Sequence, residues 1–292
     1  MHKPLFASIE ETAAFARGLD TRALGKHINF SPQVSSTNDL ALVAARAGAA
    51  HGTVFVADSQ DTGRGRRGRT WECPPRLGLL FSAVIRPAKI SPELSGWLPL
   101  AAGLACARAM SVVPLLANLS VKWPNDVVLP CAAEPGWRKL GGVLCESSLG
   151  NAGMRERGEM VLEYVVFGVG LNLNQRAAQL ATTGKGTATS IFAQTGALVD
   201  RRTVFRRVLK QLEAALDRLS DRAQQKSLQN EIESGMAAWM ARKRLRFHAP
   251  AGDKRERTGV FAGLDEFGRL RVKDECGEST FADAEIVGLG LE

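Results

Sequence analysis

A succession of short apolar runs, separated mostly by links of hairpin length, limits the folds open to this chain. The runs begin near residues 53, 77, 121, 127, 139 and 160 and have the length and composition of β-strands. One long apolar stretch, from Pro92 to Met110, interrupts them and has the length of a buried helix with Ser91 as its N-cap. This order predicts an α+β fold in which a mixed or antiparallel sheet carries helices on one side.

The same order argues against a doubly wound dinucleotide fold, in which strands and helices alternate regularly. The sequence also lacks the GxxxxGK(S/T) pattern of a phosphate-binding loop. Any nucleotide must therefore be bound by the loops between the predicted strands.

The segment from Gln60 to Trp71 is the most distinctive of these loops. It contains Gly63, Gly65 and Gly68, which alternate with four arginines between two predicted strands. Glycines make the backbone mobile and arginines concentrate positive charge, so the segment is suited to close over an anion. A solvated basic loop or a nucleic-acid arm is the alternative. The position of the loop inside a folded unit, away from either terminus, argues against an arm.

Composition places the chain among ordinary soluble proteins. It has 292 residues, 45% of them apolar and 23% charged, with a formal net charge of +8. Outside the arginine loop the basic residues are dispersed, so net charge alone does not predict a nucleic-acid-binding face. The five cysteines form no CxxC pair, which favours a reducing cytoplasm.

Targeting and membrane segments are not predicted. The N-terminus lacks the apolar core of a signal peptide. The most apolar window, Leu98 to Leu119, contains Arg108 and two prolines, so it predicts a core helix and not a membrane span.

The second half of the chain predicts two helices followed by a small β domain. One helix is expected from Asp200 to Arg218, and another from Gln224 to Ala241, which ends in the basic run Arg242 to Arg246. Short strands with glycine turns, such as Gly252-Asp253-Lys254, then predict a small β-barrel. We therefore divide the chain into a short N-terminal segment (1–32), a main domain (33–238) and a C-terminal domain (239–292).

Three further stretches carry polar residues in places suited to a site. Ser36-Thr37-Asn38 precedes a predicted helix and is most simply its N-cap. Lys122-Trp123-Pro124-Asn125-Asp126 forms a turn between two strands, where Asn and Asp more often shape the turn than bind a ligand. Lys139 enters a strand that contains Gly141-Gly142. A glycine pair in a strand marks a bulge or lets a ligand approach the backbone, and the adjacent lysine favours the ligand.

Together, and in this order, these stretches resemble the biotin protein ligases. The matching stretches are Ser36-Thr37-Asn38, Gly63 to Trp71, Lys122 to Asp126, Lys139 to Glu146, and Gly168 to Asn174. The resemblance covers about residues 33–290 and implies a catalytic core related to class II aminoacyl-tRNA synthetases, followed by an SH3-like C-terminal domain. Larger members carry a DNA-binding domain ahead of the Ser-Thr-Asn motif. Only 35 residues precede the motif here, as expected for the monofunctional type.

The resemblance implies a two-step reaction. The carboxylate of biotin attacks the α-phosphate of ATP, giving biotinyl-5′-AMP and pyrophosphate. A lysine of the biotin carboxyl carrier protein of acetyl-CoA carboxylase then attacks the mixed anhydride, giving an amide and releasing AMP. Mg²⁺ is expected to arrive with ATP, and no dedicated metal site is expected in a chain with four histidines. The implied enzyme is cytoplasmic, without membrane association or specific DNA binding, and the sequence leaves a homodimer open.

The resemblance also implies roles for residues at matching positions. Lys139, Arg66 and Arg64 are expected to be the catalytic cations, since two anions must meet in the first step. The residues expected to contact biotin are Ser36, Thr37, Asn38 and Gln60. The remaining expected binding residues are Gly65, Trp71, Lys122, Asn125, Asp126, Gly141, Gly142, Gly168, Gly170 and Asn172.

Two segments depart from the family pattern, and two other functions compete. Gln175 to Ser190, which would cover the adenine, contains no aromatic residue, and Ile286 to Gly290 lacks an arginine that some members have. The competing functions are a lipoate or octanoyl ligase or transferase of the same superfamily, and a nucleic-acid-binding regulator. The arginine loop and the Lys-Trp-Pro-Asn-Asp turn favour biotin over lipoate. The short N-terminal segment leaves too little room for a DNA-reading domain.

Overall fold

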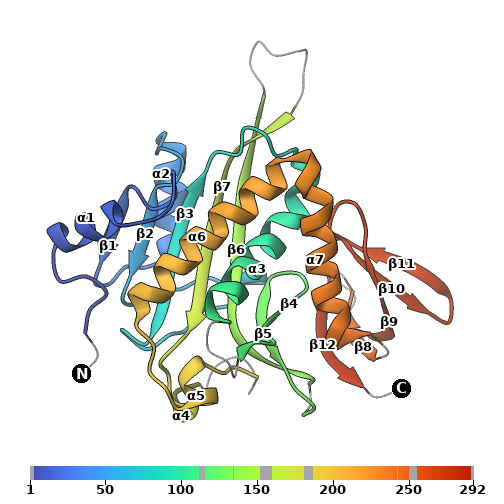
Figure 1. Ribbon diagram of the computed structural model, residues 1–292. Helices are drawn as coiled ribbons and strands as arrows, with labels where there is room; N and C mark the ends of the chain where they lie inside the picture. Colours follow the sequence, from blue (N-terminus) through green and yellow to red (C-terminus); the bar gives the residue numbers. More distant parts are fainter. Residues whose placement is uncertain are drawn as a thin grey trace.

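Two β-sheets organise the chain (Figure 1). The computed structural model describes residues 3–111, 116–133, 135–151, 160–180, 187–241, 243–249 and 255–290. A seven-stranded sheet with helices packed against it forms the body of the molecule, and a five-stranded sheet follows at the C-terminal end.

The large sheet is mixed, as predicted. Its strands run in the order β1 (Ile28–Ser31), β2 (Val54–Ala57), β3 (Gly78–Ile85), β7 (Met160–Asn172), β6 (Trp137–Asn151), β5 (Asp126–Pro130) and β4 (Ser120–Lys122). β1 and β2 are parallel, whereas every other neighbouring pair is antiparallel. The expected hairpin connection between β6 and β7 (residues 151–159) falls largely outside the described residues.

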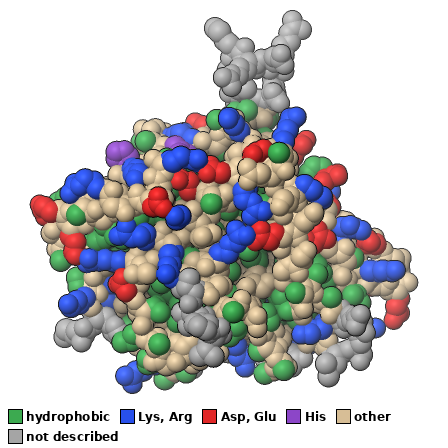
Figure 2. Space-filling model, in the orientation of Figure 1, with side chains coloured by type: hydrophobic (Ala, Val, Ile, Leu, Met, Phe, Trp, Pro, Cys, Tyr) green, Lys and Arg blue, Asp and Glu red, His purple; other side chains and the backbone are tan. Residues whose placement is uncertain are grey.

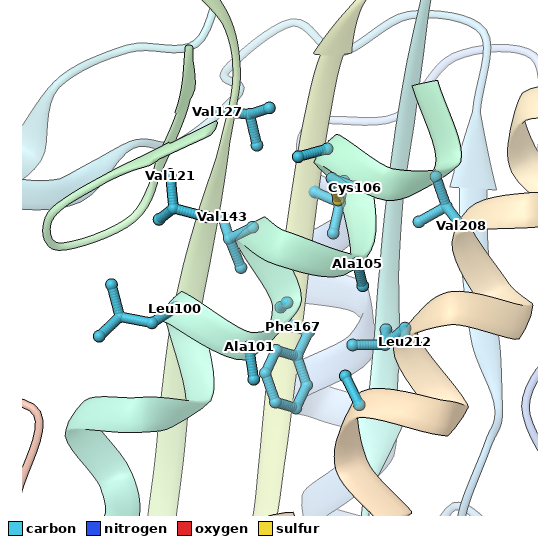
Figure 3. Close-up of a cluster of buried hydrophobic side chains, with 14 of the residues drawn as sticks. Leu100, Ala101, Ala105, Cys106, Val121, Val127, Val143, Phe167, Val208 and Leu212 are labelled. Atoms are coloured by element: carbon cyan, nitrogen blue, oxygen red, sulfur yellow. The ribbon is translucent and has the colours of Figure 1, made fainter. Parts of the chain in front are cut away.

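Helices cover both faces of this sheet. On one face, α3 (Trp97–Met110) lies between the sheet residues Val143 and Phe167 and the residues Val208 and Leu212 of α6 (Arg201–Ser220) (Figure 3). On the other face, Ala41 and Ala45 of α2 (Thr37–Arg46) pack against apolar side chains of β3 and β7. The prediction of helices on one side is therefore wrong for α2. All eight residues of β3 are buried, so both of its faces need cover.

The long apolar helix is divided where the sequence predicts a single element. Residues Pro92–Gly96 form a short 3₁₀ helix, η2, capped by the Ser91 hydroxyl, and α3 begins only at Trp97. Pro99 has no backbone N–H to donate to Ser95, so a continuous α-helix would lack that bond.

The N-terminal residues pack against the body of the molecule. α1 (Ile9–Arg17) begins at Ser8, whose side chain accepts from the backbone N–H of Glu11, and β1 joins the large sheet. Leu5 is buried, and its backbone N–H donates to the Asp58 carboxylate, which also forms a buried ion pair with Arg201 at 2.8 Å.

The C-terminal sheet consists of antiparallel strands that follow α7 (Arg222–Met240). Their order is β11 (Gly277–Phe281), β10 (Leu270–Asp274), β9 (Glu256–Leu264), β8 (Arg244–His248) and β12 (Glu285–Gly290). The indole N–H groups of Trp97 and Trp123 donate to the carbonyls of Glu266 and Gly268, so the β9–β10 turn packs on the main body. The predicted turn at residues 252–254 and the start of the basic run, Arg242, lie outside the described residues.

Two short helices, α4 (Ala177–Leu180) and α5 (Ile191–Thr195), follow β7.

Across the described ranges, no helix has the length and apolar character needed to cross a bilayer. Figure 2 shows Lys and Arg side chains interspersed with Asp and Glu over the face covered by α6 and α7, without a continuous basic patch there.

Candidate active site

One cavity of about 190 Å³ collects almost all of the residues that the sequence assigned to the site. The predicted residues that line it are Ser36, Thr37, Asn38, Gln60, Arg64, Gly65, Arg66, Trp71, Lys122, Asn125, Asp126, Lys139, Gly142, Gly168, Gly170 and Asn172. Gly141 is the exception. The stretches that resemble the biotin protein ligases, far apart in the sequence, therefore meet at one place in the fold.

Gly141 lies against the neighbouring strand and not against the cavity. A Cβ at this position would lie 2.5 Å from Leu171 Cδ2 and 2.8 Å from the Gly170 carbonyl oxygen, so the residue permits close packing of β6 on β7. The neighbouring Gly142 lines the cavity, and its nearest atoms to such a Cβ belong to Asp126 and Lys139 at 3.5 Å. Of the two glycines, only Gly142 thus lies where a ligand in the cavity could approach the backbone.

The arginine loop is folded back on itself. The Trp71 N–H donates to the Gly63 carbonyl at 2.8 Å, and the Gly65 N–H donates to the Arg69 carbonyl at 2.7 Å. A Cβ at Gly63 would lie 2.3 Å from the Trp71 oxygen, so this position requires glycine. Arg67 has a φ of 56°, which is unusual for a residue with a side chain.

Carboxylates from distant parts of the chain bind the arginines of this loop. Arg66 and Arg67 each lie 2.8 Å from an oxygen of Asp283, and Arg69 lies 3.0 Å from Glu285. Glu285 begins β12 of the C-terminal sheet, and Asp283 lies in the turn that precedes this strand. These arginines are therefore paired within the protein, which argues against their use as an open phosphate footprint for nucleic acid.

A second group of charges lies on the turn between β4 and β5. Lys139 Nζ is 2.5 Å from Asp126 Oδ1, and Lys122 Nζ is 3.2 Å from Asp126 Oδ2. Lys122 also donates to the Ile286 carbonyl at 3.3 Å, and the Asn125 amide donates to the Val143 carbonyl at 2.7 Å. The turn residues thus hold the two lysines at the cavity wall.

Burial and charge act against each other at these groups. Burial alone would raise the pKa of the Asp126 carboxyl, but the positive charges of Lys139 and Lys122 outweigh it and lower that pKa to about 2. Burial lowers the pKa of the Lys122 ammonium, and the Asp126 carboxylate opposes this effect. Desolvation likewise lowers the pKa of the Arg66 guanidinium, opposed by Asp283. A guanidinium still carries its charge at neutral pH, so Arg66 is a partly desolvated cation.

One wall of the cavity, called the inner wall below, is formed by Ser36, Thr37, Asn38 and Gln60. Ser36 occupies the N-cap position of α2, but its hydroxyl makes no capping bond and is buried without a partner. The indole N–H of Trp71 is also buried without a partner. Buried donors without partners are rare in folded proteins, and these two fit a ligand that would accept from them. The Ser36 hydroxyl therefore does not cap α2.

Two glycines of β7 make room for these groups. A Cβ at Gly168 would lie 2.4 Å from Asn38 Oδ1, and a Cβ at Gly170 would lie 2.5 Å from the Trp71 ring. Asn172, two residues further on, accepts a hydrogen bond from Gln175 at 3.0 Å. β7 therefore presents bare backbone to the cavity where polar side chains from other elements must fit.

The segment from Gln175 to Ser190, in which the sequence departs from the family pattern, runs beside Lys139 at its C-terminal end. The Lys139 N–H donates to the Thr187 carbonyl at 2.7 Å, and the Thr189 N–H donates to the Lys139 carbonyl at 2.8 Å. Ala188 lines the cavity. Residues 181–186 lie outside the described part of the chain.

Four residues near the site were missed by sequence reasoning. Ser82 and Glu146 hydrogen-bond Asn38, whereas Asp283 and Glu285 bind the arginine loop. Glu146 closes a matching stretch and could have been found there. Asp283 and Glu285 carry no local signal, because only the tertiary fold brings them to the loop. In the part of the chain that the structure covers, no group of three or more His, Cys, Asp or Glu side chains has the arrangement of a metal site.

The low pKa of Asp126 predicts a loss of stability in acid. Its folded-state pKa lies below the ordinary 3.8, so its ion pairs contribute fully above pH 4 and are lost as the pH falls from about 4 to 2. We expect urea unfolding of the native protein to lose about 2 kcal/mol more over this range than unfolding of Asp126→Asn. An equal pH dependence in both proteins would contradict the assignment.

The arginine loop should open when its carboxylate partner is removed. Asp283→Ala removes one ion pair from Arg66 and another from Arg67, each worth about 0.2–1 kcal/mol when partly exposed. Because cleavage follows the population of the open loop, we expect trypsin to cut after these arginines about threefold to tenfold faster. Glu278→Gln, which breaks an exposed ion pair with Arg271 in the same sheet, is the control. Equal cleavage rates in both variants would show that Asp283 does not hold the loop.

Comparisons with known proteins agree with the geometry. Residues 30–171 match the model of the Biotin/lipoate A/B protein ligase family. The biotin--[acetyl-CoA-carboxylase] ligase of Mycobacterium tuberculosis is 32% identical over 84% of this chain and 82% of its own length. The corresponding ligase of Paracoccus denitrificans is 30% identical over 79% of this chain and 88% of its own. The solved biotin protein ligase of Aquifex aeolicus, in complex with biotin and ATP, superposes with a TM-score of 0.70 at 27% identity, covering 89% of this chain and 99% of that one. On these similarities and on the site just described, the chain belongs to the biotin protein ligase family.

Proposed function

We propose that this protein activates biotin as biotinyl-5′-AMP with ATP and transfers it to a lysine of the biotin carboxyl carrier protein of acetyl-CoA carboxylase. The observation that carries the proposal is the meeting, in one cavity, of Lys139 and Arg66 with the buried, unpartnered hydroxyl of Ser36. A cavity that joins fixed cations to neutral hydrogen-bonding groups suits a ligand with an anionic end and a polar, uncharged ring. Biotin is such a molecule, and ATP supplies the second anion.

The first step brings a carboxylate to a phosphate, so it needs positive charge held in place beforehand. Lys139 would bind both the carboxylate and the phosphate. Its ammonium is held by Asp126 at 2.5 Å and lies 5.5 Å from the centre of the Trp71 ring. Arg66 would bind the phosphate, because burial has already removed much of its hydration. Arg64, two residues earlier in the loop, would bind the carboxylate end of biotin.

The remaining assignments follow the walls of the cavity. We assign the biotin ring to the inner wall and the nucleotide to the wall formed by the β4–β5 turn and the end of β7. The residues assigned to the ring are Ser36, Thr37, Asn38 and Gln60, beside Gly168. Those assigned to the nucleotide are Gly65, Trp71, Lys122, Asn125, Asp126, Gly142, Gly170 and Asn172. Mg²⁺ would enter with ATP, held mainly by its phosphates.

We further propose that residues 33–238 form a core of the class II aminoacyl-tRNA synthetase type and residues 239–292 an SH3-like domain. The antiparallel sheet that follows α7 supports this division. The cysteines are free thiols, which supports a reducing compartment such as the cytoplasm.

Transfer of labelled biotin to a purified carrier domain, with ATP and Mg²⁺, tests the proposal directly. We expect Lys139→Ala and Arg66→Ala to lower the rate of adenylate formation by about 10²–10³-fold, as loss of one charged group at a transition state does. Lys273→Ala, which removes an exposed lysine of β10, should leave the rate unchanged. Thermal unfolding of each variant shows whether the fold survives.

Two results would overturn the proposal. Full activity in both site variants would mean that the cations have other roles. Transfer of lipoate in place of biotin by the native protein would mean that the cavity serves the other branch of the superfamily.

A further inference from the structure

We propose that Ser82 and Glu146 are positioning residues that set the hydrogen-bonding pattern of the inner wall, so that it accepts a ring N–H group. The inference rests on the proposed function, because it concerns the recognition of the cyclic urea of biotin. Ser82 lies outside the stretches that match the family, and Glu146 ends one of them without an assigned role. Both make hydrogen bonds to Asn38.

Glu146 fixes which way the Asn38 amide points. The Asn38 Nδ2 group donates to one carboxylate oxygen of Glu146, and the other oxygen accepts from Arg64 at 2.8 Å. An ionised carboxylate can only accept, so the amide must turn its NH₂ group toward Glu146. Its oxygen then faces Ser82 Oγ at 3.1 Å, beside the bare backbone of Gly168.

Ser82 joins this amide to the rest of the inner wall. The Ser82 hydroxyl lies 2.9 Å from the Thr37 hydroxyl, which in turn lies 3.0 Å from Gln60 Oε1. Three oxygen–oxygen contacts therefore link Gln60, Thr37, Ser82 and Asn38 in a row. Ser82 is fully buried, and Thr37 and Asn38 are each 4% exposed, so this row of side chains has little contact with bulk water.

The row is short of one proton. Each contact needs a hydrogen between its two oxygens, but the two hydroxyls supply only two hydrogens for three contacts. The terminal atoms, Asn38 Oδ1 and Gln60 Oε1, are both acceptors, so no rotation of the hydroxyls satisfies the whole row. Gln60 Oε1 also accepts from the Thr37 backbone N–H at 2.8 Å, so Asn38 Oδ1 is the terminal oxygen that depends on a hydroxyl for its donor. A ligand N–H that donates to Asn38 Oδ1 gives this oxygen a donor of its own and leaves both hydroxyls free to point toward Gln60.

A cyclic urea matches this requirement. Its N–H groups can donate to Asn38 Oδ1, and its carbonyl oxygen can accept from the buried Ser36 hydroxyl. A dithiolane ring such as that of lipoate has no N–H and would offer Asn38 Oδ1 no donor. Sites built around buried polar partners reject analogues that lack the matching group more strongly than apolar pockets reject a change in size. The structure thus assigns to Ser82 and Glu146 a part in the choice between the two ring types.

Direct binding of biotin to the full chain, by titration calorimetry without ATP, tests the inference. Ser82→Ala keeps the volume of the buried site but removes the central link of the row, and we expect a biotin Kd raised roughly fivefold to tenfold. Glu146→Gln lets the facing amides turn either way, and we expect a rise of roughly tenfold or more. The KM for ATP should change less than twofold in both variants. Ser147→Ala on β6 and Glu163→Gln on β7, both exposed, are the matched controls and should bind as the native protein does.

Because Glu146 also contacts Arg64, biotinol separates the two effects. This alcohol keeps the urea ring and lacks the carboxylate that Arg64 would bind. We expect Glu146→Gln to weaken biotinol binding by a factor similar to that for biotin.

Two outcomes overturn the inference. One is a Kd within twofold of the native value in either variant. The other is a parallel loss of biotin and ATP binding together with a lower Tm, which a merely structural role would produce. Failure of the native protein to bind biotin at all would instead overturn the proposed function.

Discussion

The pairing of Asp126 with Lys122 and Lys139 is the interaction on which the rest of the site depends. The lysines enter the cavity from different strands, and each would repel the other without the carboxylate between them. Attraction to the two ammonium groups lowers the pKa of Asp126 despite its burial, so the carboxylate stays ionised at any physiological pH. Lys122 then reaches the Ile286 carbonyl of β12, so this charge cluster also contacts the C-terminal sheet.

The arginines of the loop are likewise held by carboxylates, and Arg66 also donates to the Asn125 side chain of the β4–β5 turn at 3.4 Å. Arg64 is held by Asp39 and Glu146 of the main body. Arg66 and Arg67 share Asp283, which lies in the turn between β11 and β12 of the C-terminal sheet. The loop therefore bridges the two parts of the fold, and the C-terminal sheet helps to place a cation in the cavity. A phosphate that binds Arg66 meets a guanidinium already oriented by a carboxylate.

Much of this arrangement could be predicted from sequence, because short stretches carry both the local chemistry and the resemblance to the family that implies their roles. The turn from Lys122 to Asp126, the glycines that let the arginine loop fold back, and the approach of Lys139 all follow from residue types in short stretches. Tertiary packing decided the rest. Asp283 gives no sign of a partner more than two hundred residues earlier, and Gly141 serves the contact between β6 and β7. α2 covers the second face of the sheet because β3 is buried on both of its faces. The pattern of apolar residues in the sequence did not reveal that both faces are covered.

The central claim is that the cavity joins a carboxylate to the α-phosphate of ATP. The most direct measurement is the exchange of labelled pyrophosphate into ATP with the acceptor protein left out. Our account predicts exchange that requires biotin and that lipoate does not support. Exchange that proceeds equally without biotin, or no exchange by a folded protein that binds both substrates, would contradict it.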